Sequence, residues 1–399
     1  MRHDVTLERI ELGSPRTKVF VEVPWHLFKN DPMWTPPLRG DLLGSRALGL
    51  KGLLTPQDAY HRHADVCHWI AWRGTQPVGC VSAAIDHRFN EYHGTTLGNF
   101  GFFDVADDFE ACSALLDAAR AWIAERGMVA MRGPGQYGNA THERQGVLVE
   151  GFEYPPVVEL THNPRYYGDL LERYGLCKVK DYVAYLMDIQ AAEPEALPRL
   201  AAHVREHHPE IRTRPAAMAR LEAEVALIVE LYNAAWKDNW GFMPLTPDDA
   251  DGILGSIRPI VDPEFIRFAY AGDTPAAVFG ALPDPYVALR PRWKWHGDSD
   301  AVRVARLLAT RRRIKRTRLM FFGVRPEFRA LGIDAVLYHE TLVAAKARGY
   351  ETSDISMLLE DNILIRRAAE FMGARHYKTW RIYEMPVGRL PVGPATDPV

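Results

Sequence analysis

The sequence carries one pattern of elements twice, and this internal repeat restricts the chain to folds that can be built from two similar units. In each copy an amphipathic helix ends at a glycine that lies twelve residues after a leucine, over 115–127 and again over 337–349. Further along each copy, the spacing Gly-x4-Lys-x-(Tyr or Trp)-x-x-Tyr occurs at 175–185 and at 373–383. Agreements that follow in the same order predict two copies of one fold.

Length and local composition indicate where the copies separate. With 399 residues, the chain is longer than a single hydrophobic core usually serves. A polar, proline-containing stretch near 190–210 suggests a boundary. We therefore predict a first domain over 1–195, a second over 205–388 and a tail over 389–399. Strands with hairpin signals that alternate with amphipathic helices predict the α/β (α+β) class.

Residues 318–349 in the second copy predict a strand, a tight loop and a helix. The run 319–324 is apolar without a helical period, as in a buried strand. Pro326 ends this run because proline donates no ladder hydrogen bond. Apolar residues then recur at nearly helical spacing over 334–348. The loop at 329–334 would turn backbone N–H groups and a helix N-terminus toward one point, which suits an anion such as pyrophosphate.

This stretch resembles the acetyl-CoA loop of the GNAT acyltransferase superfamily. Val324-x-Pro326-x-x-Arg329-x-x-Gly332-Ile333 is similar to the family pattern Arg/Gln-x-x-Gly-x-Gly/Ala, and Asn362 followed eleven residues on by Gly373 is similar to its last helix. The resemblance implies two GNAT-like domains, each a mixed, mostly antiparallel sheet flanked by helices, with acetyl-CoA as co-substrate. It assigns cofactor binding to Phe322, Val324, Arg329, Ala330, Leu331, Gly332, Ile333, Asp334 and Asn362.

The first copy departs from this pattern where the loop should be. In place of the Arg and Gly turn it has Ala-Asp-Asp-Phe-Glu at 106–110, which is three residues shorter than the second copy between strand and helix. Carboxylates at a helix N-terminus satisfy the helix dipole themselves and repel phosphate. We expect a degenerate first domain without the CoA loop, in which Asp107 or Asp108 caps the helix.

An aromatic segment follows the first long helix of the second copy. In the GNAT fold the corresponding segment lines the acceptor pocket, so the resemblance implies substrate contacts for Trp236, Asn239, Trp240 and Phe242. The alternative is that these aromatic residues fill the core between the two domains. Both interpretations remain open at the level of sequence.

The groups that would move protons are the least determined part of the site. The family often has a Tyr acid seven residues after the Asn, but this sequence has Ala369 there, and Asp334 occupies a loop position that is usually Gly or Ala. We therefore take Glu360 and Tyr383 as the catalytic candidates. Other carboxylate or imidazole candidates are Asp354, Glu159 and His162.

A basic stretch and the bulk composition bear on partners. Residues 290–318 hold eleven Lys and Arg, which predicts attraction of an anionic cofactor, contact with RNA, or a solvated helix face. The net charge of the whole chain is -3, so bulk electrostatics give no general affinity for nucleic acid. The four cysteines lack metal-site spacing, and no apolar run is long enough to span a membrane. We expect reduced thiols, no metal, no membrane and a cytoplasmic protein.

These features together predict a CoA-dependent N-acyltransferase. Acetyl is the expected acyl group, and the acceptor is an amine of a small molecule or peptide. One alternative is a Fem-like transferase, which also has tandem GNAT-like domains and uses aminoacyl-tRNA. The other is a protein that binds CoA without catalysis, since Asp334 and Ala369 depart from the family pattern.

Overall fold

In the computed structural model, the described residues are 4–137, 144–192, 194–246, 249, 260–291 and 298–388. We call the part up to residue 192 the first copy and the remainder the second copy. The first copy contains β1 (Val5–Ile10), α1 (Thr17–Leu27), α2 (Arg39–Leu43), β2 (Ala64–Arg73), β3 (Gln76–Asp86), α3 (His87–His93), β4 (Leu97–Val105), α4 (Phe109–Ala124), β5 (Ala130–Gly135), β6 (Val147–Glu150), α5 (Tyr166–Tyr174) and β7 (Cys177–Asp188). The second copy contains α6 (Ala196–His207), β8 (Ile211–Pro215), α7 (Leu221–Trp236), β9 (Ile266–Ala271), β10 (Thr274–Pro283), α9 (Tyr286–Leu289), α10 (Asp300–Thr310), β11 (Arg316–Val324), α11 (Ile333–Ala347), β12 (Thr352–Leu359), α12 (Ile363–Phe371) and β13 (Arg375–Pro386).

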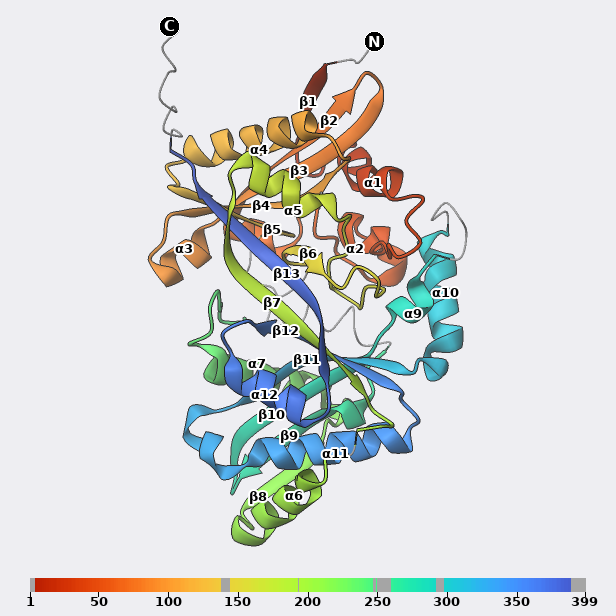
Figure 1. Cartoon of the computed structure of the whole chain (residues 1–399), viewed down its shortest axis with the longest axis vertical. Helices are drawn as coiled ribbons and strands as arrows, with labels where there is room; N and C mark the ends of the chain where they lie inside the picture. Colours follow the sequence, from red (N-terminus) through yellow and green to blue (C-terminus); the bar gives the residue numbers. More distant parts are fainter. Residues whose placement is uncertain are drawn as a thin grey trace, which may run out of the picture.

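The strands of both copies form one continuous sheet in the described part of the chain. Its order is β1-β2-β3-β4-β5-β13-β7-β12-β11-β10-β9-β8, and β6 pairs with β13 beside this path. Neighbouring strands are mostly antiparallel, but β4 pairs with β5, and β11 with β12, in parallel. The elongated molecule has the first copy at one end and the second at the other, with β7 and β13 running between them (Figure 1). This confirms the predicted mixed, mostly antiparallel sheets flanked by helices.

The two copies exchange their last strands. β13 of the second copy lies between β5 and β7, and β7 of the first copy lies between β13 and β12. Consequently Tyr383 and Met385 on β13 belong to the hydrophobic core of the first copy. Val183 and Tyr185 on β7 belong to the core of the second. The domain boundaries at 195 and 205 stay a prediction, because each core takes a strand from across that boundary.

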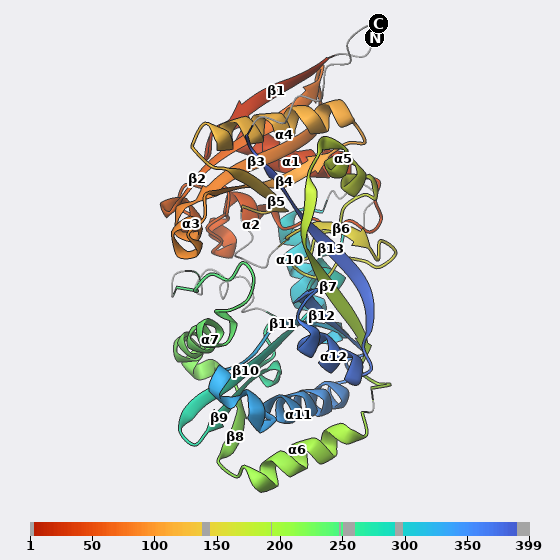
Figure 2. The ribbon, with the colours of Figure 1, turned by 60° about the vertical axis from the view of Figure 1, so that its left-hand side comes forward.

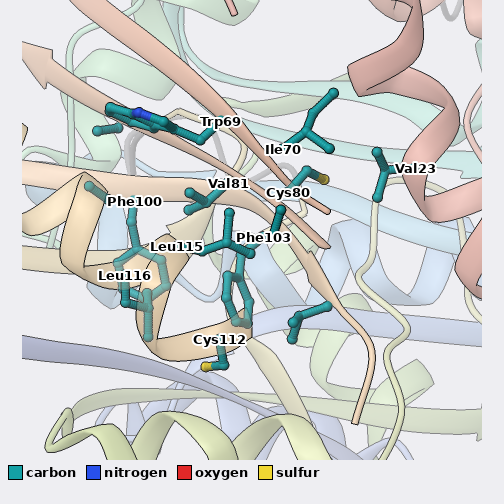
Figure 3. Close-up of a cluster of buried hydrophobic side chains, with 14 of the residues drawn as sticks. Val23, Trp69, Ile70, Cys80, Val81, Phe100, Phe103, Cys112, Leu115 and Leu116 are labelled. Carbon is teal, nitrogen blue, oxygen red and sulfur yellow. The ribbon is translucent and has the colours of Figure 1, made fainter. Parts of the chain in front are cut away.

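The core of the first copy is formed by β2, β3, β4 and the apolar faces of α1 and α4 (Figure 3). α4 places Leu115 and Leu116 against the strands with no exposed surface. Asp108 caps this helix by accepting from the Ala111 N–H at 3.2 Å, and it also pairs with Arg73 at 2.7 Å. The expected cap is confirmed. The Asp108 carboxylate occupies the N-terminus of α4, where a phosphate would otherwise bind.

Helices cover both faces of the sheet in the second copy. Phe279 of β10 packs in the cluster of α11, whereas its neighbour Val278 packs in the cluster of α7. Because adjacent strand residues point to opposite faces, α11 and α7 lie on opposite sides of the sheet. α6 packs on the outer side of α11, and α12 lies directly above α11 (Figures 1 and 2).

Most predicted elements are confirmed to within a few residues, including the hairpin of β9 and β10 and the strand, loop and helix around 318–349. β6 was not predicted. The segment Thr246-Pro-Asp-Asp249 also predicts the capped start of a helix. Thr246 and Asp249 do exchange hydrogen bonds of 2.9 and 3.2 Å, as in a capping box, but that helix and the tail at 389–399 lie outside the described residues.

Candidate functional site

The two parallel strands at the centre of the second copy separate near their carboxyl ends. β11 and β12 pair from Arg316 with Thr352 as far as Leu319 with Ile355. Just beyond, each strand has a bulge in its pairing with the strand on its other side. β11 has one extra residue, Met320, opposite β10, and the register of β12 against β7 shifts after Ile355. Bulges end pairing and redirect strands. A gap therefore opens between residues 320–324 and 356–359.

The bulge at Met320 also determines which groups face this gap. Arg325 N–H donates to Ala276 C=O at 2.9 Å, so in the antiparallel pair the N–H groups of Phe322 and Val324, three residues and one residue earlier, point away from β10. They point into the gap. Both residues were predicted to bind the cofactor, and a backbone N–H directed to this place can polarise a thioester carbonyl.

The carbonyls of these same residues are already engaged. Trp236, at the end of α7, donates its indole N–H to Phe322 C=O at 3.0 Å. Arg329 donates from Nε to Val324 C=O at 3.2 Å and from Nη2 to Ala235 C=O at 2.8 Å. Arg329 thus fixes the end of β11 against α7, while the residue itself remains exposed.

The predicted CoA loop forms a short 3-10 helix, Pro326–Leu331, followed by Gly332. Gly332 has φ of 68°, and a Cβ there would lie 2.7 Å from Val204 of α6, so both conformation and space require glycine. It precedes α11, whose N-terminus has no side-chain cap; Asp334 lies in the first turn without capping it. Ala330 is exposed, Leu331 is half-buried and Ile333 is buried. The α11 N-terminus can receive an anion, although Val204 crowds one side.

The aromatic segment after α7 lies at the gap and also contacts the first copy. Trp236 borders the gap at β11, and Trp240 packs near Tyr182, which pairs with Leu359 at the end of β12. Asn239 forms the turn between them by accepting from Phe242 N–H at 3.1 Å. Phe242 is buried, and its C=O lies 2.8 Å from the His93 ring of the first copy. Trp236 and Trp240 suit an acceptor wall, whereas Phe242 fills space between the copies.

Two predicted groups at the end of β12 have structural roles here. Asn362 caps α12 by accepting from Ile365 N–H at 3.4 Å. Glu360 accepts from Lys178 Nζ at 2.6 Å and from Asp181 N–H at 3.0 Å. These contacts hold the Glu360 carboxylate against β7 of the first copy.

Tyr383 lies away from the gap because β13 has crossed to the first copy. It is paired with Gly133 of β5, and its hydroxyl donates to Glu172 of α5 at 2.9 Å. The structure does not bring Tyr383 together with Val324. The repeat that aligned it with Tyr185 gave no sign that the two strands are exchanged.

A buried polar cluster lies on the sheet face opposite α11, next to the point where the pairing of β11 and β12 ends. Asp354 of β12 has no exposed surface and accepts from Ser356 and Tyr377. Beside it, Arg318 donates to Val158 C=O at 2.5 Å and lies 3.4 Å from the Glu159 carboxylate. Burial raises the pKa of Asp354 and of Glu159, and the Arg318 guanidinium partly opposes both shifts. Burial also lowers the pKa of nearby Lys378 to about 8.

Among these carboxylates, Glu159 is the one that solvent reaches, because its side chain is 20% exposed. It belongs to the first copy and has φ of 62°, an unusual value for a non-glycine residue. His162, the other first-copy candidate, pairs instead with Asp31 at 3.4 Å. The sequence named Asp354 and Glu159 only as alternatives, since nothing in it shows that residues 155–160 lie on this face.

The side of the β11–β12 pair that faces α11 is apolar. A pocket with about 650 Å³ of empty space, part of it open to solvent, lies between the sheet, α11 and α12. Its floor on the sheet includes Thr317 and Leu319 of β11 and Ser353 and Ile355 of β12. Since Arg318 and Asp354 alternate with these residues, the apolar pocket and the polar cluster occupy opposite faces of the same strands.

The basic stretch divides into side chains that join the two copies and side chains that remain exposed, and its three predicted roles stay predictions. Arg303 is 1% exposed and donates to Pro36, Pro37 and Leu289 carbonyls at 2.6 to 2.9 Å. Arg316 donates to Pro156 C=O at 3.0 Å and pairs with Asp284. These side chains bind the first copy to the second. Arg311–Arg313 are exposed, and residues 292–297 lie outside the described part.

Comparisons with known proteins agree with this architecture. The chain is 31% identical over 375 residues to the bacterial ceramide synthase of Caulobacter vibrioides (strain NA1000 / CB15N). The aligned residues cover 92% of this chain and 94% of that protein. It is 27% identical over 391 residues to YghO of Escherichia coli (strain K12), covering 96% and 95%. No family model matches. None of the helices in the described residues has the length and apolar character needed to cross a membrane.

Solved structures with low sequence identity share the fold. A tandem GNAT protein from the clavulanic acid biosynthesis pathway aligns with a TM-score of 0.53 at 12% identity, over 97% of this chain and 100% of that one. A probable N-acyltransferase from Enterococcus faecalis aligns with a TM-score of 0.50 at 8% identity, over 96% and 73%. The chain thus has the tandem GNAT fold with a degenerate first copy, and it belongs to the family of the bacterial ceramide synthase.

Proposed function

We propose that the protein transfers a fatty acyl group from acyl-CoA to the primary amine of a long-chain base. The observation that carries this proposal is the 31% identity to a bacterial ceramide synthase across nearly the whole of both chains. A ceramide is the amide of a long-chain base and a fatty acid, so its synthesis can proceed by N-acylation. The gap between β11 and β12, with backbone N–H groups directed into it, supports the same reaction class.

The chemistry requires one proton acceptor and one carbonyl-polarising group. The ammonium form of the acceptor first loses one proton, and its nitrogen then attacks the thioester carbon. The C–N bond forms, the C–S bond breaks, and the second nitrogen proton ends on the CoA thiolate, giving the amide and free CoA. The N–H groups of Phe322 and Val324 are suited to stabilise the oxyanion. Glu159 is our candidate for the first proton, because its pKa is raised and solvent reaches it.

The pyrophosphate of CoA is assigned to the N-terminus of α11, next to Gly332. The acceptor would approach past Trp236 and Trp240. This places the acyl donor and the amine on the two sides of the gap. The acyl group we now propose is long, in place of the acetyl group expected from the sequence.

The test is an assay of the purified full chain with palmitoyl-CoA and sphinganine, with the amide detected by mass spectrometry. Amide formation that requires both substrates is the expected result. A thiol reagent can follow CoA release once the signal of the exposed Cys177 is subtracted. If CoA and palmitoyl-CoA bind but no amine in a panel of long-chain bases, amino sugars and peptides is acylated, the protein is a CoA binder without catalysis.

A further inference from the structure

The apolar pocket has the composition of a site for an alkyl chain. Its walls come from the sheet, from α11 and from α12, and nearly all of its lining is aliphatic or aromatic: Met187, Ile189, Phe265, Phe279, Ala281, Leu319, Tyr338, Leu342, Ala345, Ile355, Ile365, Ala368, Ala369 and Met372. Hydroxyls enter only from Thr317, Thr341 and Ser353, apart from the phenol of Tyr338. Burying a charged or multiply polar group here would cost free energy without compensating partners.

The pocket begins where the gap ends. Leu319 and Ile355, the last paired residues of β11 and β12, line it, and the gap opens immediately beyond them. Phe322 connects the two places: its N–H points into the gap, while its ring packs on Tyr338, a pocket residue, with ring centroids 4.9 Å apart. A carbonyl at the Phe322 N–H and the pocket therefore lie next to each other.

The pocket is deeper than a short acyl group needs. Along α11 the lining residues run from Tyr338 to Ala345, which are seven residues or about 10 Å apart at the helical rise. Ala345 lies at the end remote from the gap, together with Ile189, and Phe265 of that end packs edge-on against Tyr350. An acetyl group would leave this space empty.

We propose that this pocket holds the alkyl chain of the acyl-CoA, and that Ala345 and Ala369 set the length of chain accepted. The inference rests on the proposed function for the identity of the donor. Ala369 is 4% exposed and stands where the GNAT resemblance had led us to look for a tyrosine. A small residue there keeps open the space between α12 and the sheet. Ala345 leaves space in the same way at the far end.

Direct binding separates this proposal from the proposed function. The affinities of CoA, decanoyl-CoA and palmitoyl-CoA are measured by calorimetry without amine, below the concentrations at which the thioesters form micelles. Each methylene buried in the pocket should increase affinity about fourfold. The variants are Ala345→Phe at the far end and the smaller Ala369→Leu on the other helix. Ala347→Phe adds the same ring as Ala345→Phe on the exposed side of α11 and serves as the matched control.

We expect both pocket variants to bind CoA as the wild type does but to lose at least tenfold in affinity for palmitoyl-CoA, with decanoyl-CoA affected less. The control should match the wild type. Equal affinities of CoA and palmitoyl-CoA for the wild type would overturn the proposal. So would an unchanged palmitoyl preference in both variants, provided that their CoA affinity shows that they are folded. If the length preference behaves as expected but no amine is acylated, the pocket assignment stands and the proposed function fails.

Discussion

Arg318 and Glu159 join the two copies beside the gap, with the guanidinium 3.4 Å from the carboxylate and hydrogen-bonded to the neighbouring Val158 C=O at 2.5 Å. Arg318 lies on a central strand of the second copy, and Glu159 comes from an irregular segment of the first. The first copy has lost its own CoA loop, yet it contributes a candidate proton acceptor to the site of the second. In the proposed reaction, the first copy would therefore contribute to the site as well as to the fold.

Glu159→Gln should lower kcat by a factor of about 100 or more, as loss of a general base usually does. In the wild type, kcat/KM should fall as pH drops through the raised pKa of Glu159, since only the carboxylate can accept a proton. The variant should lack this limb of the pH profile. Glu153→Gln, on the exposed part of the same segment, is the control and should keep both rate and profile. A pH profile that is unchanged in Glu159→Gln would exclude Glu159 as the base.

Trp236→Phe should reduce kcat/KM about fivefold, the effect of removing one neutral hydrogen bond of about 1 kcal/mol. The indole N–H fixes the carbonyl of Phe322 and so the direction of the N–H that faces the gap. Trp72→Phe is the matched control, because its indole N–H also makes one hydrogen bond, to Glu8 at 3.0 Å, but in the first copy. Equal losses of activity in both variants would mean that the effect is one of stability alone, which melting curves would show.

The site was predictable from the sequence where it depends on local pattern. The turn at Gly332 follows from the residues around it, because glycine adopts that φ without the strain that a side chain would add, and the capping role of Asp108 follows from its position at a helix start. Glu360 and Tyr383 were chosen in the same local way, from their distance along the chain to the loop. Tyr383 lies away from the gap, and Glu360, although next to it, is bonded to Lys178 and Asp181, which are far away in sequence.

What the sequence could not supply are the contacts between the copies. Tyr383 follows β12 and α12 closely in the chain, but strand exchange carries it to β5 of the first copy. Arg303 occurs in a run that is as basic as many solvated helices, yet its partners are the carbonyls of Pro36 and Pro37. Such pairings depend on which strand edge each copy leaves open, and two similar copies offer the same pattern for exchanged and unexchanged pairing.

Gly332→Ala should destabilise the protein by roughly 1–3 kcal/mol and raise KM for acyl-CoA, because a Cβ would be strained at φ of 68° and would meet Val204 at 2.7 Å. Adding Val204→Ala should recover the steric part but not the conformational part. Gly373→Ala isolates the conformational cost, since Gly373 has φ of 82° and open space around its Cβ position. Urea denaturation gives the free energy of unfolding of all three variants. If Gly332→Ala lowers this free energy no more than Gly373→Ala does, Val204 does not crowd the loop.

The exchanged strands predict that neither copy folds without the other. A fragment of residues 1–195 lacks β13, which brings Tyr383 and Met385 into its core, and a fragment of residues 196–399 lacks β7 with Val183 and Tyr185. Each fragment expressed alone should lack a cooperative thermal transition.

Co-expressed, the two fragments should purify as a one-to-one complex that melts cooperatively, because the cut lies between β7 and α6 and leaves every strand pairing available. A chain truncated after residue 374 is the control: it keeps the covalent connection but loses β13, and we expect it to unfold. Cooperative melting of the 1–195 fragment alone would show that its own β7 can close its sheet, and that the exchange is not required for folding.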